Sequence, residues 1–243
     1  MSNIHFIMNP KGGIGKSWVA VLLAQYLKSK KRKIICADTD PLTPTFIEFK
    51  SLNVARVAIF EGGKIKQAKF DPLIEMMLEE DAEFVIDTGG STYIDLMKYF
   101  MDNKTFNTLN ECGKKIFIHC PLVGGNAFQK AIDGFGDILN IKNDHFKVVV
   151  WENEFWGPVE SNGFPAVESD LYLNAVEAGK VLGSVKIKQR SESDSFVEDI
   201  NKMTTNSLTL DDVNSSAGFN LMAKMRMRTV VNDVFAELNK IKF

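Results

Sequence analysis

Short apolar runs rich in Ile, Val and Phe alternate along the chain with longer stretches of helical periodicity. The runs fall at residues 4–8, 33–38, 54–60, 83–87, 115–120, 146–151 and 183–187. Continuous apolar runs suit strands that are buried on both faces, and their alternation with helices is typical of a parallel sheet. The pattern predicts an α/β fold with one doubly wound, mostly parallel sheet of about seven or eight strands and helices on both faces.

The first apolar run leads directly into a glycine-rich segment. Residues 10–18 read Pro-Lys-Gly-Gly-Ile-Gly-Lys-Ser-Trp, and a helix-forming stretch follows at 19–27. A strand, a glycine loop and a helix in this order form a phosphate cradle, because successive backbone N–H groups and a helix N-terminus point at the anion. The segment therefore predicts binding of a nucleoside triphosphate.

Each residue type in this loop has a chemical role. The three glycines allow backbone conformations that a Cβ would forbid, Lys16 reaches the β- and γ-phosphates, and the Ser17 hydroxyl binds Mg²⁺. Pro10 removes one backbone donor at the loop entrance but leaves the rest of the cradle intact. The predicted nucleotide-binding residues of the loop are Gly12, Gly13, Ile14, Gly15, Lys16, Ser17 and Trp18.

Two further predicted strands end in acidic residues. Asp38 and Asp40 follow the second run, where both carboxylates can approach a phosphate–Mg²⁺ centre. Asp87 ends the fourth run, where an acid suits a Walker B role that holds Mg²⁺ through a water, and Gly89 and Gly90 after it are expected to move with the γ-phosphate. Each of these two segments alone would also fit an ordinary acidic turn at the end of a strand. Because both follow the glycine loop in the expected order, together they predict a nucleotide site.

The loop contains a second lysine, Lys11, and matches the form Lys-Gly-Gly-x-Gly-Lys-[Ser/Thr]. In this it resembles the ParA/MinD-type ATPases, which have a P-loop NTPase fold. The resemblance implies that Lys11 crosses a dimer interface to the partner's nucleotide, so that ATP holds a homodimer together. It further implies that Asp40 orients or activates the attacking water while Asp38 supports the metal region. The predicted catalytic residues are Lys11, Lys16 and Asp40, the predicted metal-binding residues are Ser17, Asp38 and Asp87, and the predicted cofactors are ATP and Mg²⁺.

The segment after the sixth run carries an asparagine and three aromatic residues. In the broader family an asparagine at this strand end hydrogen-bonds the adenine edge, and Asn153 is the matching residue; a turn-capping asparagine is the alternative. Trp151, Phe155 and Trp156 either flank the base or belong to the core, and the core is favoured.

Four segments narrow the resemblance to the TraL group, which are ParA/MinD-like ATPases of conjugative plasmids related to the StbB and MobD types. They are Thr-Asp-Pro-x-x-x-Thr-Phe at 39–46, residues 49–54, Asp-x-Gly-x-Ser at 87–91 and Trp-x-Asn-x-x-Trp-Gly-Pro at 151–158. Leu42 stands where many partition ATPases have glutamine, which weakens assignment to the plasmid-partition subclass. The resemblance implies partners among plasmid-encoded transfer or maintenance proteins.

Length and charge limit the remaining possibilities. A length of 243 residues favours a single P-loop ATPase domain over residues 1–243. The net charge of -2 and the pI near 6.0 argue against a generally basic protein that coats nucleic acid. No apolar run approaches the roughly 18 residues of a membrane span and no leader precedes the first strand, so we expect a cytoplasmic protein. The three cysteines are expected to be reduced thiols, and the three scattered histidines indicate no metal cluster.

Two basic segments and one polar segment carry weaker signals. The run at 30–33 is expected to be a solvated connection. A long helix is predicted at 216–241, with Val230, Val234 and neighbouring apolar residues packing on the sheet; contact of its basic residues Lys224, Arg226 and Arg228 with DNA stays open. The polar segment 188–215 is predicted to be a mobile region over the nucleotide.

Three other functions compete with a nucleotide-switched ATPase. A metabolic enzyme of the dethiobiotin-synthetase type would use ATP on a small acid, but Lys11 and the Asp38–Pro41 segment favour the switch. An iron–sulfur reductase would need two cysteines at a dimer axis, which the spacing of Cys112 and Cys120 disfavours. A scaffold without turnover is disfavoured because the expected acids and lysines are present.

Overall fold

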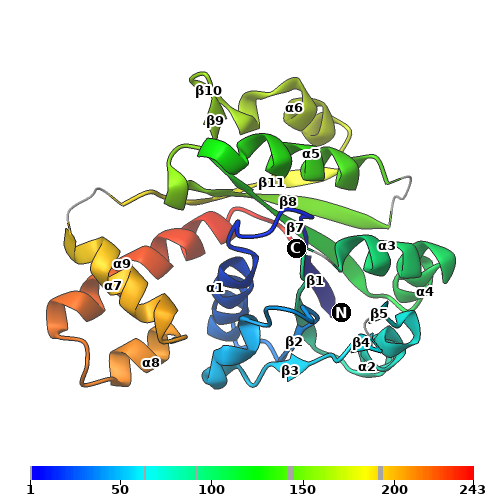
Figure 1. Cartoon of the computed structure of the whole chain (residues 1–243), viewed down its shortest axis with the longest axis horizontal. Coiled ribbons are helices and arrows are strands. Elements are labelled where there is room, and N and C mark those ends of the chain that lie inside the picture. The colour runs from blue at the N-terminus through cyan, green and yellow to red at the C-terminus, as the bar shows by residue number, and fades with distance from the viewer. Residues whose placement is uncertain (1, 63, 91, 142–144, 191–193) are drawn as a thin grey trace.

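A computed structural model of the chain describes residues 2–62, 64–90, 92–141, 145–190 and 194–243. Within these ranges, seven strands form one sheet in the order β11-β8-β7-β1-β6-β2-β3, and all neighbouring strands run parallel (Figure 1). The strands are β1 (Asn3–Ile7), β2 (Ile34–Asp38), β3 (Ala55–Arg56), β6 (Glu83–Asp87), β7 (Lys115–Val123), β8 (Phe146–Asn153) and β11 (Val181–Ile187). The predicted doubly wound α/β fold is confirmed.

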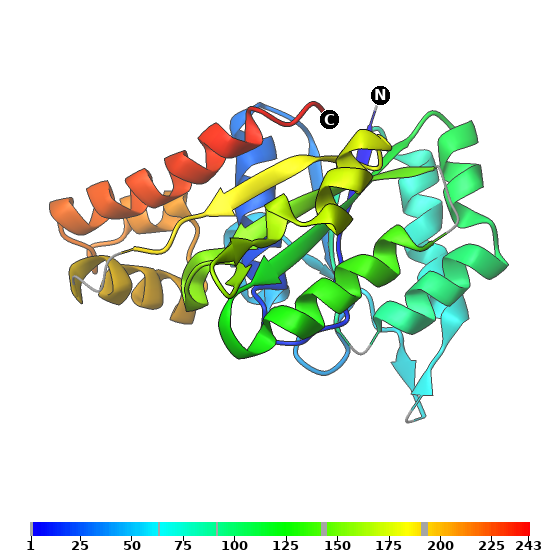
Figure 2. The same cartoon turned by 90° about the horizontal axis from the view of Figure 1, so that it is seen from above.

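Helices cover both faces of the sheet (Figures 1 and 2). One face packs against α1 (Lys16–Ser29), α7 (Asp194–Thr205), α8 (Leu210–Ser215) and α9 (Leu221–Leu238). The other packs against α2 (Asp71–Glu79), α3 (Tyr93–Asp102), α4 (Thr105–Glu111), α5 (Phe128–Leu139) and α6 (Asp170–Glu177). Because both faces are covered, the central strands are buried along almost their whole length, which explains their continuous apolar runs.

The direction of winding reverses at β1. The chain passes from β1 to β2 and β3 on one side, returns as β6, and then continues through β7, β8 and β11 on the other side. In parallel α/β sheets, ligands bind at such a reversal, outside the carboxyl ends of the strands. The glycine loop leaves the sheet at this point, and the acids after β2 and β6 lie at the same edge.

The run at 54–60 differs from its prediction. We expected a buried strand, but β3 is two exposed residues at the edge of the sheet, extended by a hydrogen bond from Val57 N to Asp38 O of 2.9 Å. An edge strand has only one neighbour, so its apolar residues are buried only where other elements cover them, as at Ile59. Two short hairpins add to the fold: β4 (Phe60–Glu61) with β5 (Lys64–Ile65), and β9 (Glu160–Ser161) with β10 (Phe164–Pro165).

The C-terminal helix packs as predicted, although α9 is shorter than the 216–241 pattern. Val230, Val231, Val234 and Leu238 are buried on the sheet face that also carries α1. Two of the helix's basic side chains are held by neighbours, Arg226 by Asp199 at 2.6 Å and Lys224 by the Asn214 carbonyl at 2.8 Å. The basic run at 30–33 is exposed between α1 and β2, as expected for a solvated connection.

Two of the three histidines, which the sequence suggested were scattered, lie together in the structure. His5 on β1 and His119 on β7 are fully buried and meet with Nδ1 and Nε2 2.9 Å apart. Trp151 Nε1 donates to His119 Nδ1 at 2.8 Å, so His119 donates through Nε2 and His5 donates in turn to Glu83 at 3.3 Å. Both imidazoles are therefore neutral, and burial lowers the pKa of each. The C-terminal residue reaches strand β1, where the Phe243 ring packs edge-on against His5.

The cysteines are unpaired thiols, with Cys36 and Cys120 buried in strands and Cys112 exposed. In the described part of the chain, no helix is long and apolar enough to cross a membrane.

Candidate nucleotide-binding site

The glycine loop joins β1 to α1 and is shaped by two of its three glycines. Gly13 and Gly15 have φ of 74° and 86°, in the left-handed region that glycine favours, and Gly15 is the N-cap of α1. A Cβ on Gly15 would also lie 2.5 Å from Asn153 Nδ2. Gly12 does not have the predicted backbone conformation that a Cβ would forbid. Its φ is not positive, and a Cβ there would meet no atom within 4 Å.

The loop entrance is fixed by residues that the sequence motif did not single out. Asn9 is fully buried; its side chain donates to Pro121 O at 3.1 Å and Ala131 O at 3.0 Å, and accepts from Lys11 N at 2.9 Å. Helix α5 approaches the entrance closely, since a Cβ on Gly134 would lie 2.6 Å from Pro10 Cδ. The loop is thus held against β7 and α5 before any ligand arrives. The position of Asn9 directly before the loop was the only available sequence signal.

Both lysines of the loop are hydrogen-bonded within it. Lys16 is 8% exposed, and its ammonium donates to Lys11 O at 2.9 Å. Burial lowers the pKa of Lys16, and the nearby Asp87 and Asp40 oppose this shift. The Lys11 ammonium donates to Gly12 O at 2.9 Å on the exposed side of the loop. A role of Lys11 in a partner's site stays a prediction.

Asp38 and Asp40 hold the segment that follows β2. Asp38 is fully buried and accepts three backbone N–H groups, from Asp40 at 2.9 Å, Phe46 at 3.0 Å and Ile47 at 3.2 Å. Burial raises the pKa of Asp38, and these hydrogen bonds oppose the rise. The carboxylate therefore fixes the backbone of the turn. Its predicted metal binding stays a prediction.

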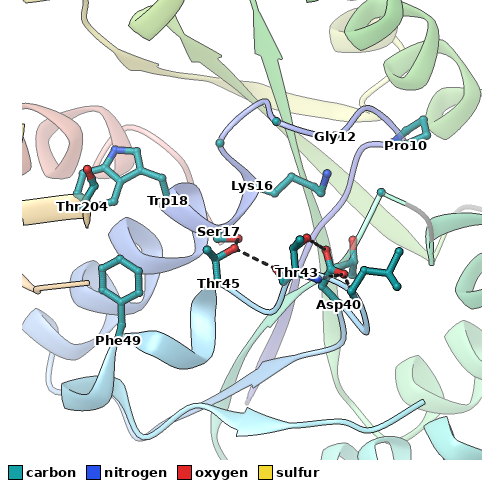
Figure 3. A pocket seen from close by; sticks show the side chains of 15 residues that line it. Pro10, Gly12, Lys16, Ser17, Trp18, Asp40, Thr43, Thr45, Phe49 and Thr204 are labelled. Atoms are coloured by element: carbon teal, nitrogen blue, oxygen red, sulfur yellow. Dashed lines mark hydrogen bonds between the residues drawn. The ribbon is translucent and has the colours of Figure 1, made fainter. Parts of the chain in front are cut away.

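The Asp40 carboxylate lies at the rim of the site, opposite Lys16 (Figure 3). Oδ1 accepts from Leu42 N at 2.9 Å and Thr43 N at 3.0 Å, while Oδ2 accepts only the Thr43 hydroxyl, at 3.1 Å. Among the described residues Oδ2 thus accepts one hydrogen bond, and a carboxylate oxygen can accept a second. Gly89 allows this arrangement, because a Cβ there would lie 2.7 Å from Asp40 Cγ.

The glycines after β6 serve close packing in this structure. Like Gly89, Gly90 has no room for a side chain, since its Cβ would lie 2.7 Å from Pro10 O. Their expected motion with the γ-phosphate stays a prediction. Ser91, the last residue of the Asp-x-Gly-x-Ser segment, lies outside the described residues.

Asp87, at the end of β6, is the buried acid of the site. It is 2% exposed, and its Oδ1 is one of two buried side-chain N or O atoms in the described ranges that have no hydrogen-bond partner. Burial raises the pKa of Asp87 to about 7, against the lowering effects of the Ser17 hydroxyl and Lys16. A buried carboxylate oxygen without a partner is costly unless a ligand or cation meets it.

The Ser17 hydroxyl lies 3.0 Å from Thr45 Oγ1 (Figure 3), and Thr45 comes from the same segment as Asp40. Hydroxyl and carboxylate oxygens are suitable ligands for Mg²⁺, which keeps several waters and phosphate oxygens in such sites. The hydroxyls of Ser17 and Thr45 and the nearby buried carboxylate of Asp87 are therefore of the ligand types that suit a magnesium ion. Thr45 was not predicted as a site residue, although it belongs to the quoted 39–46 pattern.

Two adjoining cavities open around the loop. The first, of about 520 Å³, is lined by Lys16, Ser17, Asp40 and Thr45 and suits the phosphates and metal. The second, of about 410 Å³, lies beyond Gly15 and is mostly apolar. Both are bordered by Gly13, Gly15, Trp18 and Thr204, so one nucleotide can occupy both.

Asn153 and the aromatic residues after β8 divide between the core and the second cavity. Asn153 is 4% exposed; its Nδ2 donates to Ile14 O at 3.1 Å and its Oδ1 accepts from Phe155 N at 3.3 Å. Trp151 is fully buried, as favoured. Phe155 and Trp156 are 47% and 62% exposed and line the second cavity, so for these two the preference for the core is wrong.

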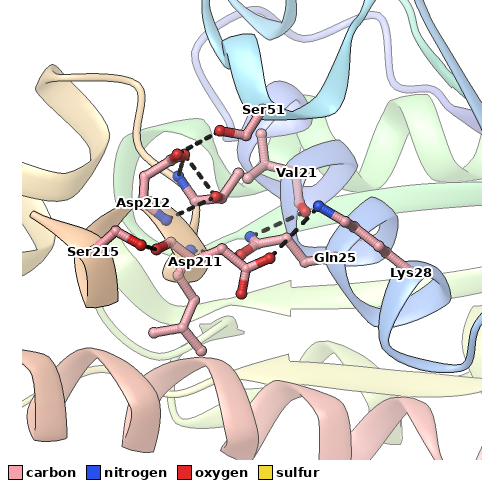
Figure 4. A network of polar contacts seen from close by, with 9 residues as sticks. Val21, Gln25, Lys28, Ser51, Asp211, Asp212 and Ser215 are labelled. Carbon is pink, nitrogen blue, oxygen red and sulfur yellow. Dashed lines mark hydrogen bonds and ion pairs between the residues drawn. The ribbon is translucent and has the colours of Figure 1, made fainter.

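The polar segment 188–215 contains α7 and α8. Thr204 on α7 borders both cavities, and Val197 and Ile200 line the second. Helix α8 is tied to α1, because Leu210 N donates to Gln25 Oε1 at 2.7 Å and Lys28 pairs with Asp211 at 3.5 Å (Figure 4). It is also tied to the short 3-10 helix Lys50–Leu52, since Asp212 accepts the Ser51 hydroxyl. The segment thus lies beside the nucleotide cavities; residues 191–193 lie outside the described ranges, and mobility stays a prediction.

Comparison with known proteins agrees with this geometry. Residues 5–240 match the family described as the CobQ/CobB/MinD/ParA nucleotide binding domain. Two proteins named TraL from Escherichia coli are each 31% identical to the chain, over 238 and 240 residues, and each match covers 98% of both sequences. The predicted resemblance to the ParA/MinD-type ATPases and to the TraL group is confirmed.

Two solved structures share the fold at low identity. A putative plasmid partition protein from Borrelia burgdorferi B31 bound to AMPPNP has a TM-score of 0.51 at 16% identity, over 99% of this chain and 100% of the other. The MinC:MinD cell division protein complex of Aquifex aeolicus gives 0.52 at 12% identity, over 100% and 98% of the two chains. Since the family match spans nearly all of its length, the chain belongs to the CobQ/CobB/MinD/ParA nucleotide-binding family.

Proposed function

We propose that the chain is a Mg²⁺-dependent ATPase that acts as a nucleotide-switched homodimer in plasmid transfer or maintenance. The observation that carries the proposal is the buried Asp87 oxygen without a partner, next to Ser17 and Lys16 at the start of α1. A cation and phosphates would satisfy these groups together. The AMPPNP-bound partition protein of similar fold and the two relatives named TraL support ATP as the nucleotide and a plasmid context.

The chain's own residues would divide the chemistry. The backbone N–H groups of the loop and the Lys16 ammonium would bind the β- and γ-phosphates. Bound Mg²⁺ would neutralise charge that develops on the phosphates, held by Ser17 directly and by Asp87 through water. Asp40 Oδ2 would orient the attacking water, since it accepts one hydrogen bond, from the Thr43 hydroxyl, among the residues that the structure describes.

Dimerisation would need little rearrangement of Lys11. Its ammonium is held by one hydrogen bond, to Gly12 O on the exposed side of the loop. Exposed hydrogen bonds of this kind contribute little to stability, so a partner's phosphate can replace the carbonyl as acceptor. Plasmid-encoded transfer or maintenance proteins would then recognise the dimer, in the cytoplasm.

Asp40→Ala tests the switch. The variant should bind ATP, fail to hydrolyse it and remain a dimer on size-exclusion chromatography with ATP and Mg²⁺, whereas the wild type returns to monomer as ATP is consumed. An Asp40→Ala protein that binds ATP normally but stays monomeric would refute the nucleotide-switched dimer.

Two lysine variants serve as controls for this experiment. Lys16→Ala should lose nucleotide binding, because it removes the charge aimed at the phosphates. Lys11→Ala should keep ATP binding but lose the dimer and turnover. An equal loss of ATP affinity in both, without a separate dimer defect, would contradict the role given to Lys11.

A further inference from the structure

A hydroxyl group of the segment after β2 meets the start of α1 in the first cavity. Thr45 Oγ1 lies 3.0 Å from Ser17 Oγ, and both residues line the cavity of about 520 Å³ that also holds Lys16 (Figure 3). Thr45 is exposed, and so is the hydrogen bond between the two hydroxyls. A ligand in this cavity can therefore reach both oxygens.

The separation of the two oxygens matches one edge of a magnesium coordination shell. Mg²⁺ binds oxygen ligands at about 2.0–2.1 Å in near-ideal octahedral geometry. Two ligands at right angles on such an octahedron are about 2.9 Å apart. The observed separation of 3.0 Å lets both hydroxyls bind one cation with almost no movement of either segment.

Each of the two hydroxyls has another acceptor for its proton. Thr45 Oγ1 donates to Thr43 O at 3.2 Å, and a hydrogen bond from Ser17 lowers the pKa of Asp87. A hydroxyl that directs its proton to such an acceptor presents its lone pairs to a cation, and acceptors of this kind orient metal ligands in proteins. The hydrogen bond between Ser17 and Thr45 can therefore be given up when a cation binds.

The backbone on both sides of Thr45 is anchored by the two acids that follow β2. Phe46 N donates to the buried Asp38 Oδ2 at 3.0 Å, and Thr43 N donates to Asp40 Oδ1 at 3.0 Å. Thr45 thus projects from a segment that is already held in place. Binding of a cation to a group that is positioned in advance costs little ordering entropy.

We propose that Thr45 is a direct ligand, beside Ser17, of the Mg²⁺ that accompanies the bound nucleotide. This inference rests on the proposed function, because it requires a metal–nucleotide complex in the loop. It gives the segment after β2 a contact with the metal itself. That segment is then tied to the start of α1 while the metal–nucleotide complex is bound and is released when the complex leaves.

Calorimetry with AMPPNP, in Mg²⁺ and separately in EDTA, distinguishes metal-dependent from metal-independent binding. Thr45→Val keeps the shape of the side chain and removes the hydroxyl. It should weaken binding in Mg²⁺ by about 10-fold or more, as is typical for loss of a group that supports a metal site, and leave binding in EDTA unchanged. Thr45→Ser keeps the hydroxyl and should bind like the parent protein in both conditions.

Thr204→Val is the matched control for this comparison. Thr204 lines the same cavity, but its hydroxyl donates to Ile200 O of its own helix at 2.9 Å. Its Mg²⁺ dependence should equal that of the parent. Ser17→Ala is the positive control and should lose Mg²⁺ dependence.

Exchange of the metal tests for direct contact. Thr45→Cys should bind AMPPNP weakly in Mg²⁺ and regain affinity in Cd²⁺, because a soft thiolate ligand prefers a soft metal ion. An ultraviolet charge-transfer band of the Cd²⁺–thiolate bond should appear together with this recovery. Thr204→Cys should show neither effect, and the parent measured in Cd²⁺ gives the contribution of the native cysteines.

The outcomes separate the role of Thr45 from the proposed function. If Ser17→Ala loses Mg²⁺ dependence while Thr45→Val keeps it, or if Thr45→Cys is not rescued by Cd²⁺, Thr45 is not a metal ligand. Equal losses of Thr45→Val in Mg²⁺ and in EDTA would also overturn the proposal, since the effect would then be structural. A parent protein that binds AMPPNP equally well with and without Mg²⁺ would instead refute the proposed Mg²⁺-dependent function.

Discussion

Replacing Asp87 by asparagine tests the electrostatics of the phosphate site. The carboxyl is 2% exposed, and burial raises its pKa from 3.8 to about 7. A folded-state pKa above the unfolded value means that the protonated form stabilises the fold. Its contribution is complete below pH 3.8 and is lost as the pH rises to about 7. Asparagine has nearly the same shape but cannot ionise, so Asp87→Asn should remove this pH dependence.

The change in the free energy of unfolding with pH follows from the shift in the pKa of Asp87. Each pH unit between the unfolded and folded pKa costs about 1.4 kcal/mol of unfolding free energy. Between pH 5 and pH 7 the wild type should therefore lose about 2 kcal/mol relative to Asp87→Asn, with little further change above pH 8. The comparison with the variant cancels the contributions of titrating groups that do not interact with Asp87; Lys16, Asp38 and Asp40 do interact with it.

Urea denaturation of both proteins at pH 5 to 8, in EDTA and without nucleotide, measures this difference. Adding Mg²⁺ and ATP at pH 8 should stabilise the wild type strongly and the variant weakly, because the ionised carboxylate then has a cation to meet. A difference between wild type and variant that stays constant with pH would show that Asp87 is ionised freely in the fold, and the reasoning about the metal site would fail with it.

Two further predictions concern the sheet and the loop. The Asp87→Asn variant should lose stability as the pH falls from 7 to 5, because the pKa values of His5 and His119 are lowered in the fold. Below the ordinary histidine pKa of 6.5 the unfolded chain then binds more protons than the folded chain. A stability from urea denaturation that does not change with pH would mean that the two histidines are charged in the fold. Gly134→Ala should weaken ATP binding about 10-fold, because the added Cβ displaces the loop entrance. Gly136→Ala on the same helix should bind ATP normally, since a Cβ there would meet no atom within 4 Å. Equal ATP affinities of the two variants in calorimetry would exclude a tight contact between α5 and the loop entrance.

The fold was largely predictable because its signals are local. All seven apolar runs contribute to the sheet, since strands covered on both faces must be apolar at successive positions. The sequence also predicted that the loop, Asp40 and Asp87 lie together at one edge of the sheet, because each follows or ends a parallel strand. Their roles toward a nucleotide stay predictions. The prediction of a buried strand at 54–60 failed because the signal is only local. An apolar run does not reveal whether its strand lies in the centre of the sheet or at its edge.

Contacts between distant segments could not be predicted. His5 and His119 are 114 positions apart, and their hydrogen bond depends on the pairing of β1 with β7. Trp151 and Trp156 belong to one aromatic segment, yet one is buried and the other is 62% exposed. Composition alone does not separate them.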